Sequence, residues 1–246
     1  MKVAVISDIH GNMQALEVVL VDIEKEKCEK ILCLGDLAMA GSEPVRAIQA
    51  IKKLYDEDKL ELIQGNTDEM IGSYAEFGEE VKSKFPIMGN ALENDVQIIP
   101  EDLKIFLKNL PKQLELGIEG VKILLVHGSP RSNSENISPD LPIEKVEEMI
   151  AQTDAEVIFC GHTHIPCGYQ ARTKQTVINV GSVGRPFTPN PQACYVIVNF
   201  FHGTFEISHK FIDYDKQKAA KILAKRDFTG SDKLAQILIR PEVRHL

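Results

Sequence analysis

The sequence lacks the features of secreted and membrane-spanning proteins. It has five cysteines, an odd number without a C-x-x-C pair, which suits a reducing compartment better than a disulfide framework. No apolar stretch reaches the roughly 18 residues of a membrane span. The amino-terminal apolar run meets Asp8 and His10 before the apolar region of a signal peptide is complete. We therefore expect a cytoplasmic protein with no membrane partner.

Positive charge is also scarce. The chain has 28 lysines and arginines against 36 aspartates and glutamates, which gives a net charge of −8. This balance argues against stable binding to nucleic acid, because such binding depends on neutralising phosphates. The charged stretch at 213–227 is accordingly interpreted as a solvated amphipathic helix. If this chain acts on phosphate, its positive charge must be concentrated at one site.

The first third of the chain has the pattern of a parallel sheet with helical crossovers. Continuous apolar runs predict strands that are buried on both faces, at residues 2–7, 30–34 and 60–63. Apolar residues at helical spacing predict helices between these strands, at residues 13–27 and 43–56. Ser42 is a candidate cap for the second helix. This βαβαβ order predicts an α/β fold.

The rest of the chain combines a less regular helical segment with a β-rich half. Residues 68–110 mix charged helical turns with Gly and Pro, and predict a small helical insertion or lid. Three further elements are predicted, namely a hairpin at 113–127, a helix at 142–152 and a buried strand at 156–161. Beyond residue 166, β-rich runs without a helix between them predict antiparallel strands. The length and the absence of repeats predict a single domain over residues 1–246.

Polar side chains that can bind metal follow nearly every predicted strand. They are Asp8, His10, Asp36, Asn66, His127, His162 and His164. We expect them to converge, because open α/β sheets bind ligands in the crevice beyond the carboxyl ends of their strands. Within two pairs the residues lie two apart, so their side chains leave an extended chain on the same face. These pairs are Asp8 with His10, and His162 with His164.

Each of these residues also has an ordinary structural explanation. Asp8 could cap the following helix, Asp36 could form an Asx turn, and Asn66 could be part of a Gly-Asn turn. Taken singly, such explanations are favoured, but seven coincidences at strand ends favour a metal site. Carboxylate, amide and imidazole ligands together suit Mn²⁺, Fe or Zn²⁺ better than Ca²⁺, and seven ligands suit two ions. The remaining histidines are given no role: His202, His209 and His245.

Five short motifs together resemble the calcineurin-like metallophosphoesterase superfamily. They are Asp-Ile-His at 8–10, Gly-Asp at 35–36, Gly-Asn at 65–66, His-Gly at 127–128 and Gly-His-Thr-His at 161–164. The resemblance covers residues 3–200. The segment "GSVGRP" at 181–186 is similar to that of a small prokaryotic branch containing phosphodiesterases and diadenosine-tetraphosphate hydrolase-like proteins. The resemblance implies a four-layer αββα sandwich, in which two mixed sheets pack face to face with helices outside.

The resemblance also implies which residues bind which metal ion. In the family the DxH pair and the last histidine of GHxH hold the first ion, which implies Asp8, His10 and His164. The aspartate of the Gly-Asp motif bridges both ions, which implies Asp36. The second ion is then held by Asn66, His127 and His162. Mn²⁺ is favoured for both ions, with Fe, Zn²⁺ and Ni²⁺ as alternatives.

The implied activity is hydrolysis of a phosphodiester or phosphoanhydride bond in a small phosphoester or nucleotide, by a hydroxide that bridges the two ions. We expect three residues to take part in catalysis: Asp36, His127 and Arg185. Arg185 would position a phosphate or the leaving group, although its loop is equally well interpreted as a connection between strands. The enzymatic alternatives are a phosphomonoesterase or protein phosphatase and a dinucleoside-polyphosphate hydrolase.

One position departs from the family pattern. Many members continue the Gly-Asn motif with a histidine that is thought to protonate the leaving group, where this chain has Thr67. A hydroxyl cannot hold an ionisable proton near pH 7, so we expect alkyl monoesters to be poor substrates and diesters or anhydrides to be better ones. Asp68 would support that histidine and is here interpreted as a helix cap. Thr67 also favours a catalytically weakened metal-binding scaffold, but the complete ligand set argues against one.

Overall fold

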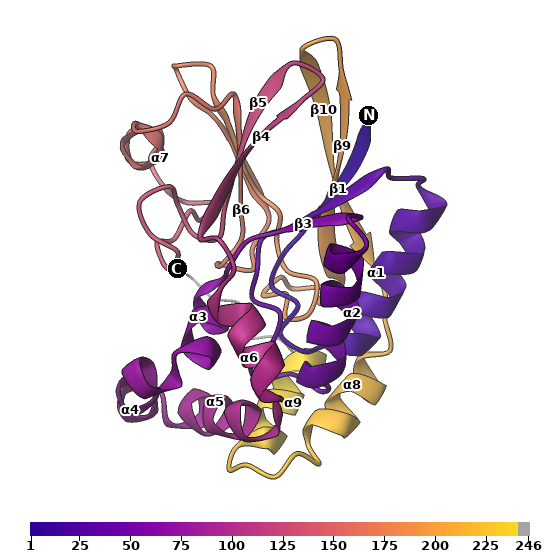
Figure 1. Ribbon diagram of the computed structural model, residues 1–246, viewed down its shortest axis with the longest axis vertical. Coiled ribbons are helices and arrows are strands. Elements are labelled where there is room, and N and C mark those ends of the chain that lie inside the picture. Colours follow the sequence, from indigo (N-terminus) through magenta and orange to yellow (C-terminus); the bar gives the residue numbers. More distant parts are fainter. Residues whose placement is uncertain (241–246) are drawn as a thin grey trace.

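Two five-stranded sheets form the centre of the fold in a computed structural model that describes residues 1–240 (Figure 1). The first sheet has the order β10–β9–β1–β2–β3. Its strands span Lys2–Ile6 (β1), Lys30–Cys33 (β2), Leu60–Leu62 (β3), Ala193–Phe201 (β9) and Thr204–Ile212 (β10). Strands β1, β2 and β3 are parallel, and β9 pairs antiparallel with both β1 and β10. The predicted βαβαβ order is therefore confirmed.

The second sheet has the order β4–β5–β6–β8–β7. Its strands span Gln113–Ile118 (β4), Val121–Val126 (β5), Val157–Cys160 (β6), Cys167–Gln170 (β7) and Thr176–Asn179 (β8). The hairpin of β4 and β5 lies where it was predicted. The expected antiparallel pairing is found between β7 and β8, but on its other side β8 pairs parallel with β6, which was not predicted. The chain between them forms the edge strand β7, and this strand lets β8 return beside β6 without a crossover helix.

Helices cover the outer face of each sheet, which confirms the predicted four-layer αββα sandwich (Figure 1). Within residues 1–240 they are α1 (Met13–Lys25), α2 (Pro44–Asp56), α3 (Asn66–Gly72), α4 (Tyr74–Lys84), α5 (Pro86–Ile98), α6 (Glu101–Lys108), α7 (Ile143–Ile150), α8 (Lys216–Leu223) and α9 (Ser231–Ile239). Helices α1 and α2 pack on the first sheet, α8 packs on α1 and α9, and α7 packs on the second sheet. None of these helices has the length and apolarity needed to cross a bilayer.

Successive side chains of a central strand point to opposite faces of the sheet. Both faces are covered, which explains why the sequences of these strands are continuously apolar. In β1, Val3 and Val5 belong to the core between the two sheets. Ala4 and Ile6 point the other way and pack under the helices of the first sheet. All four side chains are fully buried, because both faces of the strand are covered. This packing holds the carboxyl ends of the strands in fixed positions.

Two details of the predicted helices need correction. Glu43, rather than Ser42, occupies the N-cap of α2, and the Ser42 hydroxyl donates to Gln14 Oε1 at 2.8 Å. Helix α8 is shorter than the predicted segment at 213–227. It buries Ala219, Ala220 and Leu223 on one side, as expected of an amphipathic helix.

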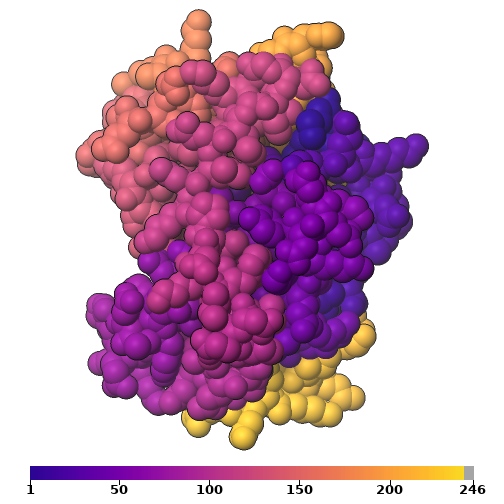
Figure 2. All heavy atoms as spheres, viewed as in Figure 1, coloured from indigo at the N-terminus to yellow at the C-terminus, as the bar shows by residue number. Residues whose placement is uncertain are grey.

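Helices α3 to α6 occupy the segment between β3 and β4 and lie below the sheets in Figure 1. We call them the α3–α6 lobe. Figure 2 shows much of this lobe in purple and magenta at the lower left of the molecule. Its helices pack on one another, with contacts between α3 and α6 and between α4 and α5. The lobe therefore projects from the sandwich on the side where strands β1, β2 and β3 end.

A buried ion pair fastens the lobe to the rest of the molecule. The guanidinium of Arg226 donates to the carboxylate of Asp95 in α5. The same guanidinium donates to Asn94 Oδ1 at 2.6 Å and to Gly41 O at 2.8 Å. Asp95 is fully buried and also accepts the backbone N–H of Met39 at 2.8 Å. Burial raises the pKa of Asp95, and the charge of Arg226 opposes this rise.

Replacing Arg226 by methionine is expected to lower the free energy of unfolding by about 3–5 kcal/mol, because it leaves the buried Asp95 carboxylate without its partner. The matched control is Arg46→Met. The side chain of Arg46 is 56% exposed and pairs with surface glutamates, so its loss should cost about 1 kcal/mol or less. Urea denaturation followed by circular dichroism measures both changes. Equal losses in the two variants would contradict the prediction.

Candidate metal centre

The seven predicted ligands lie in loops at the carboxyl ends of strands from both sheets. The first sheet contributes Asp8 and His10 after β1, Asp36 after β2 and Asn66 after β3. The second sheet contributes His127 after β5, and His162 and His164 after β6. Hydrogen bonds join these loops directly. The backbone N–H of His10 donates to Asp36 O at 2.9 Å, and that of His162 donates to Asp8 Oδ2 at 3.0 Å.

Five of the seven residues adopt left-handed backbone conformations. Their φ angles are 55° at Asp8, 47° at His10, 55° at Asp36, 67° at His162 and 62° at His164. This conformation is unfavourable for residues with a Cβ atom, by roughly 1–2 kcal/mol each, and it persists only where the surrounding structure imposes it. Such strain clusters at functional sites. These loops are therefore shaped to direct polar side chains toward one point.

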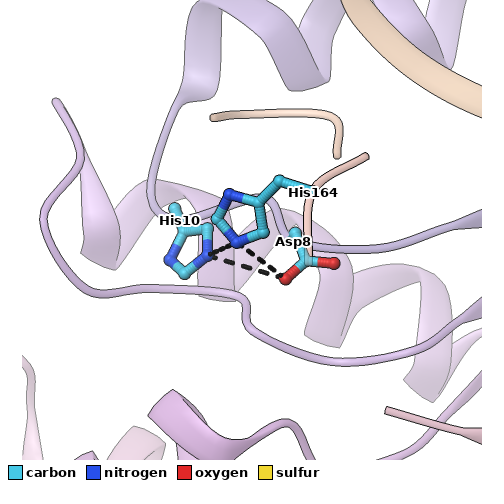
Figure 3. A group of neighbouring side chains, drawn as sticks. All are labelled: Asp8, His10 and His164. Carbon is cyan, nitrogen blue, oxygen red and sulfur yellow. Dashed lines mark hydrogen bonds and ion pairs between the residues drawn. The ribbon is translucent and has the colours of Figure 1, made fainter. Parts of the chain in front are cut away.

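Asp8, His10 and His164 form the group of donor atoms drawn in Figure 3. Their side chains point toward one another, and all three residues are buried. His164 Nε2 lies 3.2 Å from Asp8 Oδ1 and 3.0 Å from His10 Nε2. His10 Nε2 lies 3.7 Å from Asp8 Oδ1. Among the described residues, Asp8 Oδ1 is one of few buried polar atoms without a hydrogen-bond partner.

Backbone carbonyl groups orient three of the histidine rings. Nδ1 lies 2.7 Å from Leu34 O in His127, 2.7 Å from Arg185 O in His164 and 3.2 Å from Met39 O in His10. A carbonyl can only accept, so each Nδ1 carries a proton, and in the neutral form of each ring the lone pair of Nε2 points into the site. The two lone pairs of His10 and His164 then face each other at 3.0 Å. A cation between them would relieve this repulsion, so the residues present fit a metal ion.

The remaining donor atoms lie beside this group. His127 Nε2 lies 3.4 Å from Asp36 Oδ2 and 3.9 Å from Asp8 Oδ1. The side-chain oxygen of Asn66 lies 3.0 Å from His127 Nε2 and 2.8 Å from Nδ1 of His162. Asp36 Oδ2 also approaches His10 Nε2 at 3.5 Å. Asp36 therefore lies between the group of Asp8 and the group of Asn66.

The electrostatics of the site favour positive charge. Burial alone would raise the pKa of Asp36, but the charge and hydrogen bond of His127 and the charge of His10 lower it to about 2. Burial alone would lower the pKa of His127, but the charges of Asp36 and Asp8 raise it to about 10. Burial lowers the pKa of His164 to about 4, so this ring is neutral and able to bind a metal. A divalent ion would replace the proton that the carboxylates otherwise hold on His127.

Asp68 has a larger role than the helix cap that was predicted. It accepts the backbone N–H of Gly65 at 3.0 Å at the start of α3, as a capping residue does. It also accepts the N–H groups of Asp36 at 2.8 Å and Leu37 at 2.9 Å, and it is fully buried. The carboxylate therefore ties the Asp36 loop to α3. The sequence contains no signal for these partners, because they lie more than thirty residues away.

Thr67 lies at the centre but uses its polar groups on the protein itself. Its backbone N–H donates to Asp36 Oδ1 at 2.8 Å. Its hydroxyl donates to Ala38 O at 3.1 Å, and the residue is 5% exposed. This hydroxyl therefore helps to fix the Asp36 loop and replaces no general acid.

A cavity of about 260 Å³ opens over the centre. Its polar lining consists of His10, Asp36, Asn66, Thr67, His162, His164 and Arg185. Its apolar lining consists of Met39, Met70, Val81, Phe85, Met88 and Phe187. The apolar lining could not be predicted from the sequence, because its members are spread over three helices and three connecting segments with no common spacing. The predicted participant Arg185 lies in the same cavity as the metal-competent residues.

The other histidines lie away from this cavity or outside the described residues. His209 lies on β10, and its Nε2 contacts the backbone oxygen of Asn179 at 2.8 Å. His202 lies in the turn between β9 and β10, with a φ of 50°. His245 falls outside residues 1–240.

Comparisons with known proteins agree with this architecture. Residues 1–203 match the calcineurin-like phosphoesterase superfamily domain. An uncharacterized protein of Methanocaldococcus jannaschii is 32% identical over 240 residues, which covers 91% of this chain and 92% of that protein.

Two solved structures share the fold over nearly their whole length. A hypothetical protein from Pyrococcus horikoshii has a TM-score of 0.86 at 23% identity, with 96% of this chain and 97% of that chain covered. A metallophosphoesterase from Sphaerobacter thermophilus has a TM-score of 0.77 at 21% identity, with 98% and 99% covered. With the match over residues 1–203, these findings show that the chain belongs to the calcineurin-like phosphoesterase superfamily.

Proposed function

We propose that this chain is a cytoplasmic phosphodiesterase that uses two divalent metal ions, with Mn²⁺ favoured, and cleaves phosphodiester or phosphoanhydride bonds in small molecules. Asp8, His10 and His164 would hold one ion. Asn66, His127 and His162 would hold the other, and Asp36 would bridge them. Two sets of donor atoms support this proposal. One set comes from Asp8, His10 and His164, and the other from Asp8, Asp36 and His127. Within each set, the donor atoms lie within 4.8 Å of one another.

The observation that carries the proposal is the convergence of electron-pair donors on one point. Backbone carbonyl groups hold three imidazole rings so that Nε2 faces inward, and Asp8 Oδ1 has no hydrogen-bond donor. Such a cluster of acceptors is unfavourable in a buried site unless a proton or a metal cation joins it. The same atoms form the floor of a cavity, so a substrate can reach them.

The chain itself supplies charge, orientation and shielding from water. Bound divalent ions would supply a hydroxide nucleophile near neutral pH and would neutralise the phosphoryl oxygens. Asp8 and Asp36 offset the charge of the ions, and the carbonyl partners keep the imidazole rings oriented. The guanidinium of Arg185 lies in the same cavity and can donate N–H groups to a phosphate oxygen. The α3–α6 lobe covers one side of the cavity and limits the access of water.

Thr67 favours a diester or anhydride substrate over an alkyl monoester. Its hydroxyl already donates to Ala38 O and has no ionisable proton near neutral pH. Among the described residues that line the cavity, the only side chains with an ordinary pKa near 7 are histidines that are candidate metal ligands. A leaving group that is stabilised without protonation is therefore preferred.

Chelator-treated protein should hydrolyse neither bis(p-nitrophenyl) phosphate nor an alkyl monoester such as ethyl phosphate. Adding Mn²⁺ should restore turnover, with kcat/KM for the diester about tenfold or more above that for the alkyl monoester, because p-nitrophenolate leaves without protonation whereas an alkoxide needs a general acid. Absorbance of p-nitrophenolate measures the first rate, and released phosphate measures the second. Faster turnover of the monoester would overturn the substrate preference. If Mn²⁺ restored neither activity, the chain would be a metal-binding scaffold rather than an enzyme.

A further inference from the structure

Six of the residues that line the cavity are apolar and form part of its wall. Met70 comes from α3, Val81 from α4 and Met88 from α5. Phe85 joins α4 to α5 and is 61% exposed, so its ring lies at the rim of the cavity and is available to a ligand. Met39 and Phe187 complete this surface, which we call the apolar wall. The side chains of the wall offer no hydrogen-bond donor, and their only acceptors are thioether sulfurs, which are weak.

The apolar wall is continuous with the candidate metal centre. The ring of Phe187 stacks on His164, with centroids 4.8 Å apart and an angle of 4° between the planes. Arg185 Nη1 lies 3.5 Å from the sulfur of Met88, and its guanidinium lies 5.7 Å from the centroid of Phe187. A phosphoryl group at the metal centre would therefore place its ester substituent beside the wall.

The chemistry of the wall selects among possible substituents. Three thioethers and two phenyl rings form a soft, polarisable surface that favours flat aromatic groups. A charged or strongly hydrated substituent would lose its hydration there without gaining hydrogen bonds. The volume of about 260 Å³ lies below the roughly 300–1,000 Å³ typical of sites for drug-sized ligands. It suits one ring beside the phosphoryl group rather than two nucleosides.

We propose that the apolar wall is a subsite for a single flat aromatic group on the phosphodiester, either an aryl ring or a nucleobase, held by burial and stacking. This inference rests on the proposed phosphodiesterase function. Because the side chains of the wall offer no donor and only weak thioether acceptors, the edges of a base are not read, and different bases are accepted alike. The substrate class is thus a diester with one aromatic substituent, and neither a dinucleoside polyphosphate nor a purely alkyl diester.

The test compares three diesters with the same p-nitrophenolate leaving group, in which the second ester group is methyl, phenyl or thymidine 5′-yl. With Mn²⁺ present, kcat/KM for the phenyl and thymidine esters should exceed that for the methyl ester by about 10- to 100-fold, because each buries a further ring. Equal rates for all three would overturn the subsite while leaving the phosphodiesterase in place. A gain confined to the thymidine ester would also overturn it, because polar contacts to sugar or base would then be responsible.

Variants and a binding measurement separate the subsite from catalysis. Phe85→Ala and Met88→Ala should each reduce the phenyl-to-methyl ratio about three- to tenfold, mainly through KM. Phe201→Ala removes an exposed phenylalanine from the end of β9 and should leave the ratio unchanged. Calorimetry should show phenylphosphonate binding about tenfold tighter than methylphosphonate. If no ester turns over but this difference persists, the subsite stands and the proposed activity fails. Equal affinities would overturn the subsite.

Discussion

Replacing Asp36 by asparagine is expected to lower kcat/KM for an aryl phosphodiester with Mn²⁺ by about 100-fold or more. Asp36 Oδ2 lies 3.4 Å from His127 Nε2 and 3.5 Å from His10 Nε2. Its other oxygen accepts the backbone N–H of Thr67 at 2.8 Å. An amide keeps that acceptor, but it removes the charge and directs an NH₂ group at both imidazole rings. Initial rates and the manganese content per chain measure the effect.

The matched control for this variant is Asp58→Asn, which makes the same chemical change at a side chain that is 94% exposed. We expect the control to retain both its rate and its manganese. Circular dichroism establishes whether each variant is folded. If folded Asp36→Asn protein kept its rate within a factor of about ten, Asp36 would not be a shared ligand.

Replacing Thr67 by histidine is expected to raise kcat/KM for alkyl phosphate monoesters by about 100-fold, the lower end of what general acid catalysis contributes. Thr67 lines the cavity beside Asp36 and Asn66, so an imidazole there can reach a leaving group. Unlike a hydroxyl, it can be protonated near pH 7. The gain should grow as the leaving group becomes poorer. Because the acid acts only when protonated, the rate of the variant should fall as pH rises above the pKa of the new imidazole.

The control for this gain is Thr67→Gln, which has a similar reach and no titratable proton. Like the histidine variant, it gives up the hydrogen bond to Ala38 O. Rates across a series of monoesters, measured as a function of pH, compare the two proteins. A gain of equal size in the glutamine variant, or one independent of the leaving group, would show that bulk rather than proton donation is responsible.

The layered fold could be predicted from the sequence because its central strands are covered on both faces. Residues 2–7 and 156–161 are apolar without alternation, and this pattern marks strands buried between two layers. The position of the polar residues follows from a general property of such sheets, since the carboxyl ends of parallel strands meet at one edge. Asp8, His127 and His164 each follow such a strand, and they lie together in the structure.

Other parts of the site depend on tertiary contacts that leave no local pattern. The pairing of β8 with β6 is decided by how β7 folds back at the edge of the sheet. Asp68 holds a loop that lies 32 residues earlier in the chain, and its neighbours in sequence do not distinguish this from a cap. The apolar wall exists only because the α3–α6 lobe folds over the strand ends, which brings Phe85 and Phe187 to the same cavity.

The two sheets share the candidate metal centre, and this has a consequence for how the fold assembles. His10 and His164 are 154 residues apart in the sequence, yet their Nε2 atoms lie 3.0 Å apart. Closing so long a loop costs chain entropy, so the donor atoms meet only after the sheets have docked. A cation bound there would act as a non-covalent cross-link between the two halves of the sandwich. Its free concentration would then contribute to the stability of the whole chain as well as to chemistry at the site.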